Sequence, residues 1–152
     1  RANDALAETN RKSMFATVVL GIYQVSTGSF AYANAAHFPP LRLSPGAPPE
    51  ELEGARNLAL GLMSGMNYRC LRTRLEPGDA LMLYTDGVTE ALDRQGRQFG
   101  PDRLFEAISG SKPDAYASSD EILASLSLAI SRFTTGAGQS DDITALLFRR
   151  CL

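Results

Sequence analysis

The chain has 152 residues, of which 44% are hydrophobic and 21% are charged, and its formal net charge is −2. This composition is sufficient for one globular domain with an apolar core and excludes a disordered chain. No run of adjacent basic residues is longer than two, as in Arg11-Lys12, which is too short to hold a phosphate backbone, so nucleic acid is not an expected partner. Cys70 and Cys151 lack the paired spacing of a zinc site or redox dithiol, which favours reduced thiols and a cytoplasmic location.

The first half of the chain predicts mainly strands. Residues 2–11 read as the end of a helix, and residues 15–25 as a long strand that is apolar on both faces and therefore covered on both sides. A turn at Gly28 leads into a returning strand over residues 30–34, which completes a hairpin. Residues 41–43 form an edge-like strand, and the loop-forming composition of residues 44–51 follows it.

The second half predicts strands followed by helices. A strand ends at Leu75 and another covers residues 80–84, with Pro77-Gly78 as the turn that pairs them. Helices are expected from residue 100 and from Ser118, where Ser118 and Glu121 have the spacing of a capping box. Because strands and helices fall in separate blocks, the fold class predicted is α+β.

Two short acidic motifs dominate the chain. Residues 84–91 (YTDGVTEA) follow an apolar run, and residues 139–144 (QSDDIT) precede another. If these runs are antiparallel neighbours, Asp86 meets Asp141 and Asp142. Three clustered carboxylates repel one another unless a cation lies among them, and oxygen ligands suit Mg²⁺ or Mn²⁺.

Simpler structural interpretations of these motifs stay open at this point. Asp86-Gly87 is also a common hairpin turn. Asp141 and Asp142 could be charged residues that protect an aggregation-prone strand. Glu90 could face a metal site or cap the next turn, and Asp79 is expected to be a turn residue.

Four segments, in this order, give the chain a wider resemblance: residues 14–21 (MFATVVLG), 32–40 (YANAAHFPP), 75–91 (LEPGD running into LYTDGVTEA) and 139–144 (QSDDIT). Together they resemble the C-terminal part of the metal-dependent Ser/Thr protein phosphatases (PPM superfamily, type-2C-like), in their bacterial SpoIIE/RsbU-type branch. The resemblance covers roughly residues 3–150. It implies an antiparallel β-sandwich flanked by helices, an αββα arrangement.

The resemblance also implies roles for individual residues. Asp86 and Asp141 are direct metal ligands, Asp142 belongs to the same metal site with a role that is more supporting than ligating, and Gly87 lets the backbone approach closely. The intact site holds two Mn²⁺ or Mg²⁺ ions. His37, the one histidine, is expected to have a structural role, with its ring bonded to a loop backbone.

One departure from the family matters. Its members carry two further motifs upstream of the segment that matches residue 14, a Gly-Gly-Asp-rich strand and an Asp-Val-Ser-Gly-His-Gly turn whose first Asp bridges the metals. Neither occurs in residues 1–152. We therefore expect these residues to be the C-terminal portion of a single phosphatase domain, lacking its N-terminal strands and inactive alone.

The resemblance further implies a function for the intact protein. It hydrolyses phosphoserine or phosphothreonine on a regulatory protein similar to an anti-anti-sigma factor, under the control of an upstream sensor or receiver domain. The alternative is a non-catalytic pseudophosphatase or interaction module. Uncovered strand edges make a homo-oligomer possible.

Overall fold

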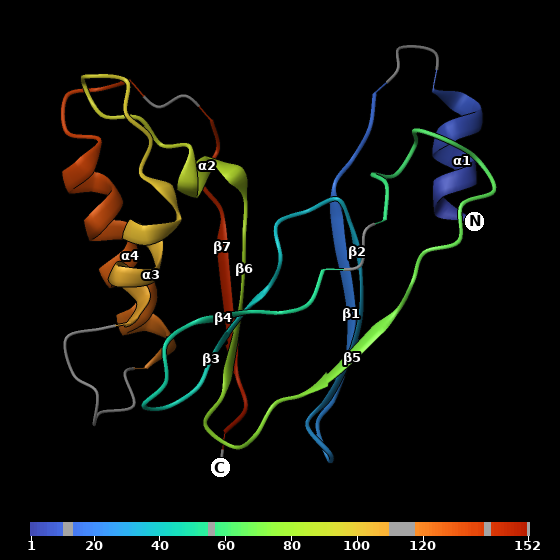
Figure 1. Ribbon diagram of the computed structural model, residues 1–152, viewed down its shortest axis with the longest axis horizontal. Coiled ribbons are helices and arrows are strands. Elements are labelled where there is room, and N and C mark those ends of the chain that lie inside the picture. Colours follow the sequence, from blue (N-terminus) through green and yellow to red (C-terminus); the bar gives the residue numbers. More distant parts are fainter. Residues whose placement is uncertain (11–13, 55–56, 110–117, 139–140, 152) are drawn as a thin grey trace. The chain divides into compact units, whose positions relative to one another are not determined.

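The structure is a computed structural model, shown in Figure 1, and it describes residues 1–10, 14–54, 57–109, 118–138 and 141–151. The chain separates into two compact units. The first contains residues 1–39 and 53–75, and the second contains residues 40–52 and 76–152. Each unit is described by itself. In the described residues, no helix has the length and apolar character needed to cross a membrane.

The first unit is built on a three-stranded antiparallel sheet. Its elements are α1 (Ala2–Thr9), β1 (Val18–Gln24), β2 (Ser29–Ala35) and β5 (Leu71–Arg74). The strand order is β1-β2-β5. The β1–β2 hairpin turns at Gly28, whose φ of 75° is readily reached only without a side chain. The predicted helix tail and hairpin are confirmed.

The expectation that the first long strand is covered on both faces is wrong. β1 is an edge strand of this sheet, and Leu20 and Ile22 are 70% and 74% exposed. In β2, by contrast, Phe30, Tyr32 and Asn34 are buried. Apolar residues on both faces of a strand indicate that each face can pack against other apolar groups. They do not show that residues 1–152 supply the groups that cover both faces.

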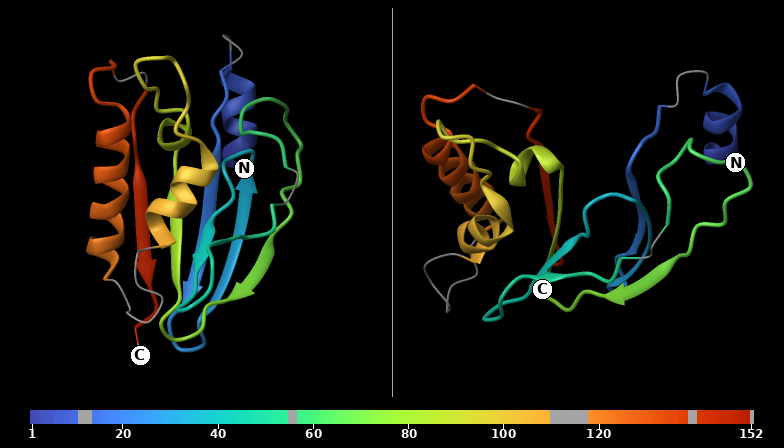
Figure 2. Two further views of the ribbon diagram at one scale, coloured as in Figure 1. Left: turned by 60° about the vertical axis from the view of Figure 1, so that its left-hand side comes forward. Right: turned by 45° about the horizontal axis from the view of Figure 1, so that its top comes forward.

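The second unit is a four-stranded antiparallel sheet with its helices on one side (Figure 2). The elements are β3 (Leu41–Leu43), β4 (Glu50–Glu51), β6 (Ala80–Tyr84), α2 (Asp86–Thr89), α3 (Gly100–Ser109), α4 (Ser119–Phe133) and β7 (Ala145–Arg149). The strand order is β4-β3-β6-β7. The α+β fold class is confirmed.

The core of this unit lies between the sheet and the two longer helices. It contains Leu41, Ala80, Met82, Tyr84, Val88, Ala91, Phe99, Leu104, Ile108, Ile122, Leu126, Ile130 and Leu147. The predicted α4 start is confirmed in detail, because the Ser118 hydroxyl accepts from the Glu121 N–H at 3.1 Å and the Glu121 carboxylate accepts from the Ser118 N–H at 2.7 Å. This reciprocal cap satisfies two backbone donors at the helix end.

Two predicted strand relationships are wrong. β3 is internal and not an edge, because residues 50–51, expected to be loop, form β4 and pair with it. β5 and β6 are not paired with each other, since they belong to different sheets. The Pro77-Gly78 turn exists, with Gly78 at φ 94°, and the Asp79 carboxylate accepts from the Glu76 N–H at 2.9 Å. Asp79 is therefore a turn residue, as predicted, but the turn carries the chain from one sheet to the next.

Candidate metal centre

The described residues of the two acidic motifs lie at neighbouring strand ends, and Gln139 and Ser140 of the second motif lie outside the described residues. β6 and β7 pair antiparallel, so the end of β6 lies beside the start of β7, with Tyr84 opposite Ala145. The pairing continues beyond the strands, because the Thr85 N–H donates to the Thr144 carbonyl and the Thr144 N–H donates to the Thr85 hydroxyl oxygen, both at 3.0 Å. The Thr85 hydroxyl also donates to the Asp142 carbonyl at 3.1 Å. These bonds fix the backbone of one acidic motif against the other.

Gly87 brings the two motifs into direct contact. A Cβ atom at this position would overlap the carbonyl oxygen of Asp142 and lie 2.9 Å from its carbonyl carbon. Gly87 is buried and lies in α2, which begins at Asp86. The alternative of a hairpin turn at Asp86-Gly87 is therefore wrong. At Gly87 the backbone lies close to the Asp142 backbone, and the expected approach of Gly87 to a metal site stays a prediction.

The three aspartates have exposed side chains around this junction. The Gly87 N–H donates to Oδ1 of Asp86 at 3.0 Å, and the Asp142 N–H donates to Oδ1 of Asp141 at 2.7 Å. Within the described part of the chain, the His, Cys, Asp and Glu side chains form no group of three or more that could hold a metal ion. The structure thus joins the two backbone segments, while shared coordination by the three carboxylates stays a prediction.

Tyr84 and Glu90 lie on either side of the Asp86-Gly87 segment, Tyr84 as the last residue of β6 and Glu90 directly after α2. Glu90 is exposed at the end of α2, where its N–H donates to the Asp86 carbonyl at 2.8 Å. Tyr84 is only 3% exposed. Burial, with a smaller contribution from Glu51, raises the pKa of Tyr84 to about 12. Tyr84 is a neutral phenol at neutral pH, as an ordinary tyrosine is, and the raised pKa keeps it neutral to higher pH.

Asp93 is a buried acidic residue that the sequence analysis missed. Its carboxylate accepts from the Gln95 and Arg97 N–H groups, each at 2.9 Å, and from Arg97 Nε at 2.7 Å. Burial alone would raise the pKa of Asp93, but these hydrogen bonds and the Arg97 charge outweigh it and lower the pKa. The Asp93-Arg94-Gln95-Gly96 sequence has turn-forming composition, the signal that could have revealed this side-chain-stabilised turn.

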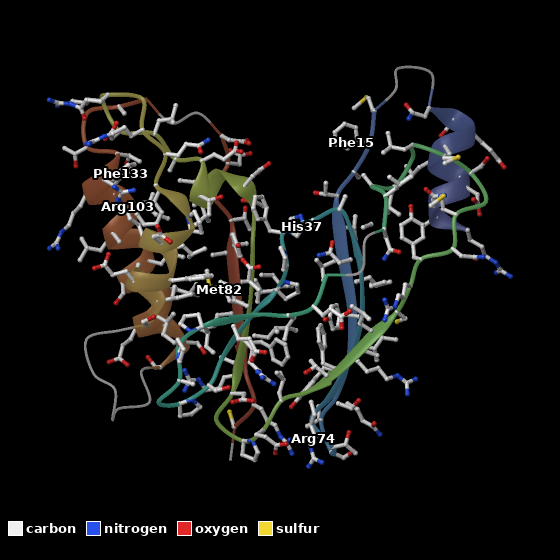
Figure 3. All side chains as sticks on the ribbon, in the orientation of Figure 1. Phe15, His37, Arg74, Met82, Arg103 and Phe133 are labelled. Carbon is white, nitrogen blue, oxygen red and sulfur yellow. The ribbon has the colours of Figure 1, made fainter. Side chains whose placement is uncertain are left out.

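His37 lies in the first unit, where it closes the end of β2 (Figure 3). Its ring Nδ1 lies 3.0 Å from the hydroxyl oxygen of Thr17, so the expected ring bond to a loop backbone is wrong. The backbone of His37 is held instead by the Asn34 side chain, whose Oδ1 accepts from the His37 N–H at 2.8 Å and whose Nδ2 donates to the His37 carbonyl at 2.9 Å. A side-chain hydroxyl was available to the ring because β1 and β2 are hairpin partners.

Comparison with known proteins shows the family and supports the fold. The family model for Stage II sporulation protein E (SpoIIE) matches residues 1–151. The chain belongs to the SpoIIE family. The resemblance predicted from the four sequence segments is therefore confirmed, as is the PPM phosphatase-like fold class.

Two relatives match this chain over only part of their own length. Protein IcfG of Synechocystis is 31% identical over 149 residues, which is 97% of this chain and 23% of IcfG. The phosphoserine phosphatase RsbU of Bacillus subtilis is 33% identical over 90 residues, which is 59% of this chain and 27% of RsbU. The chain thus spans less than a third of either curated relative.

A solved structure supports the fold independently. The PP2C phosphatase domain of SpoIIE from Bacillus subtilis, solved with a fragment of its regulatory domain, matches 97% of this chain and 41% of that chain with a TM-score of 0.76. The identity is 19%, so this likeness concerns the fold. Among the relatives, RsbU is named a phosphoserine phosphatase.

Proposed function

We propose that this SpoIIE-family chain is the C-terminal part of a metal-dependent phosphatase domain that hydrolyses phosphoserine or phosphothreonine on a protein. The observation that carries the proposal is the junction at Gly87, where Thr85-Asp86-Gly87 lies against Asp142 at adjacent ends of β6 and β7. The relative RsbU, a phosphoserine phosphatase by name, supports the reaction class.

The donor set at this junction fits a hard divalent cation. Asp86, Asp141 and Asp142 supply oxygen donors only, and Mg²⁺ and Mn²⁺ prefer such ligands. Gly87 leaves room for the backbone of Asp142, where any side chain would push the two motifs apart. We assign Asp86 and Asp141 as ligands and Asp142 as a residue of the same metal site whose backbone fixes the loop. Two cations, when bound, would supply water activation and offset phosphoryl charge.

The protein's own contribution is positioning. The Thr85 hydroxyl and the Thr85–Thr144 backbone pairing hold the start of α2 in register with the segment that carries Asp141 and Asp142, so that the backbones bearing the carboxylates are fixed before a cation binds. His37 has no assigned proton-transfer role. The bridging Asp of the family lies in a motif upstream of the segments found here, so residues 1–152 alone are proposed to be inactive.

The substrate and the regulation belong to the same proposal. By resemblance, the substrate is a small regulatory phosphoprotein similar to an anti-anti-sigma factor, and an upstream sensor or receiver domain controls the rate. The cytoplasm is the proposed location.

The test is a Mn²⁺-dependent rate series with phosphoserine peptides. Residues 1–152 should show almost no turnover, whereas a longer protein that carries the two upstream acidic motifs should show turnover that depends on Mn²⁺ or Mg²⁺. Asp86→Asn in the longer protein should abolish turnover, and His37→Ala should retain most of it. Full activity in Asp86→Asn would refute the assigned site, and an inactive longer protein that still binds a phosphoprotein would favour the pseudophosphatase alternative.

A further inference from the structure

Away from the acidic motifs, α3 and α4 enclose a shallow pocket of about 390 Å³. The residues that line it are Phe99, Arg103, Glu106, Ala107, Ala129, Arg132 and Phe133. All of them belong to the second unit. The floor is apolar, and the charged side chains on it are two arginines and one glutamate, which gives a local excess of one positive charge.

Arg103 is held in place before any ligand arrives. Its Nη1 donates to the Phe99 carbonyl at 2.8 Å and to the Gln98 carbonyl at 3.3 Å. Its guanidinium carbon lies 4.8 Å from the centroid of the Phe133 ring, and Figure 3 shows the two side chains together. Phe133 is itself supported by an edge contact with Phe99, with ring centroids 5.4 Å apart. The Arg103 side chain has therefore already lost conformational freedom on folding, and binding a ligand would cost it less additional entropy.

The bonds from Nη1 leave the Nε and Nη2 edge of the guanidinium outside these contacts. That edge has the geometry that receives a carboxylate through two parallel hydrogen bonds. Arg132, in the last turn of α4, supplies a second positive charge on the same pocket. An anion on this surface would therefore lie beside apolar side chains and would accept charge-assisted hydrogen bonds from Arg103.

We propose that the α3–α4 pocket docks an acidic segment of a partner protein. In that segment, one aromatic or aliphatic side chain enters the pocket and a neighbouring Glu or Asp pairs with Arg103. Charge complementarity selects this occupant. Two arginines against Glu106 leave the pocket with one excess positive charge, which attracts a carboxylate, and the apolar lining residues Ala107, Ala129 and Phe133 favour an apolar group beside it. This pocket lies outside the metal centre, and the proposal does not depend on phosphatase activity.

The test uses three fluorescent ten-residue peptides that share a central Phe and differ in its neighbours, which are Glu, Gln or Lys. Fluorescence anisotropy is measured against residues 1–152 without metal or phosphate. The Glu peptide should bind about tenfold more tightly than the Lys peptide, with affinity falling as salt rises. Arg103→Gln should weaken that binding about tenfold, and Arg103→Lys should weaken it less because the charge remains.

Arg72→Gln is the matched control, because Arg72 is an exposed arginine of β5 in the other unit. It should bind the Glu peptide as the unchanged chain does, and circular dichroism checks that each variant is folded. Equal binding of the Glu and Lys peptides, or unchanged binding in Arg103→Gln, would overturn the proposal. So would no binding of the Glu peptide at millimolar concentration, or a dimer in light scattering that Arg103→Gln dissociates, since the occupant would then be a second copy.

Discussion

Gly87 is the residue whose missing side chain allows the two acidic motifs of the candidate site to pack together. Its lack of a side chain allows α2 to start directly beneath the Asp142 carbonyl. Because the atom opposite is backbone, it has no alternative rotamer that would accommodate a methyl group. The cost of a side chain here must appear as movement of one acidic motif relative to the other.

Replacing this glycine should separate the motifs. Gly87→Ala is expected to lower the free energy of unfolding by about 1–3 kcal/mol, because the new methyl group overlaps the Asp142 backbone. Urea denaturation measures the change. Gly54→Ala is the control, since no heavy atom lies within 4 Å of a Cβ at Gly54. Equal stability of the two variants would contradict the close approach.

Asp93 gives a prediction for pH dependence. Its folded-state pKa is below the ordinary value of 3.8, so the stabilisation is present above pH 3.8 and is lost as pH falls through the lowered folded-state pKa. Asp93→Asn removes the charge that receives the Arg97 guanidinium. Urea denaturation between pH 6 and pH 2.5 should therefore show a smaller acid-induced loss of stability in Asp93→Asn. Parallel curves for the two proteins would exclude a lowered pKa at Asp93.

At the scale of elements, predictions succeeded where the signal is local. The α4 start could be predicted because its cap involves only residues 118–121, and the β1–β2 hairpin because a glycine turn joins adjacent strands. The partner of β5 could not, since a turn sequence such as Pro77-Gly78 does not say whether the chain returns beside itself or crosses to another sheet. β4 was missed because two glutamates after a proline-rich loop carry no strand signal, and only pairing with β3 makes them a strand.

The α4 cap should contribute measurably to stability. Ser118→Ala removes the acceptor of the Glu121 N–H, and we expect the free energy of unfolding to fall by about 1 kcal/mol. Thermal and urea denaturation measure the loss. Ser127→Ala changes the same residue type at an exposed position inside α4, and it should be neutral or slightly stabilising. A larger loss in Ser127→Ala than in Ser118→Ala would contradict the assigned cap.

For the whole molecule, the exposed face of β1 predicts self-association. Leu20 and Ile22 are more than two-thirds exposed on an edge strand, an arrangement that favours pairing with another chain. Light scattering should show concentration-dependent oligomers of residues 1–152, and Ile22→Lys should reduce them. Leu128→Lys, at a 51% exposed position of α4, should not. A strict monomer at high concentration that binds no hydrophobic dye would count against this prediction.

Part of the candidate site could be predicted from the sequence, and part of it depends on contacts between residues far apart in the chain. The meeting of the two acidic motifs could be predicted on the condition that their two apolar strands pair antiparallel, because one motif follows its strand and the other precedes its strand. The extra bonds through Thr85 could not be predicted, since a threonine before an Asp-Gly pair has no distinctive pattern. By resemblance, the family's further metal ligands belong to motifs that residues 1–152 do not contain. The positions of those ligands could therefore not be predicted from these residues.

The central claim is that Asp86 and Asp141 serve one metal-dependent reaction. A double-mutant cycle on Mn²⁺-dependent kcat/KM, in a longer protein that carries the upstream motifs, tests this most directly. Asp86→Asn and Asp141→Asn should each reduce kcat/KM by about 10³-fold, and the double variant should lose little more than either single variant. Losses that multiply in the double variant, or a single variant that retains full activity, would contradict the claim.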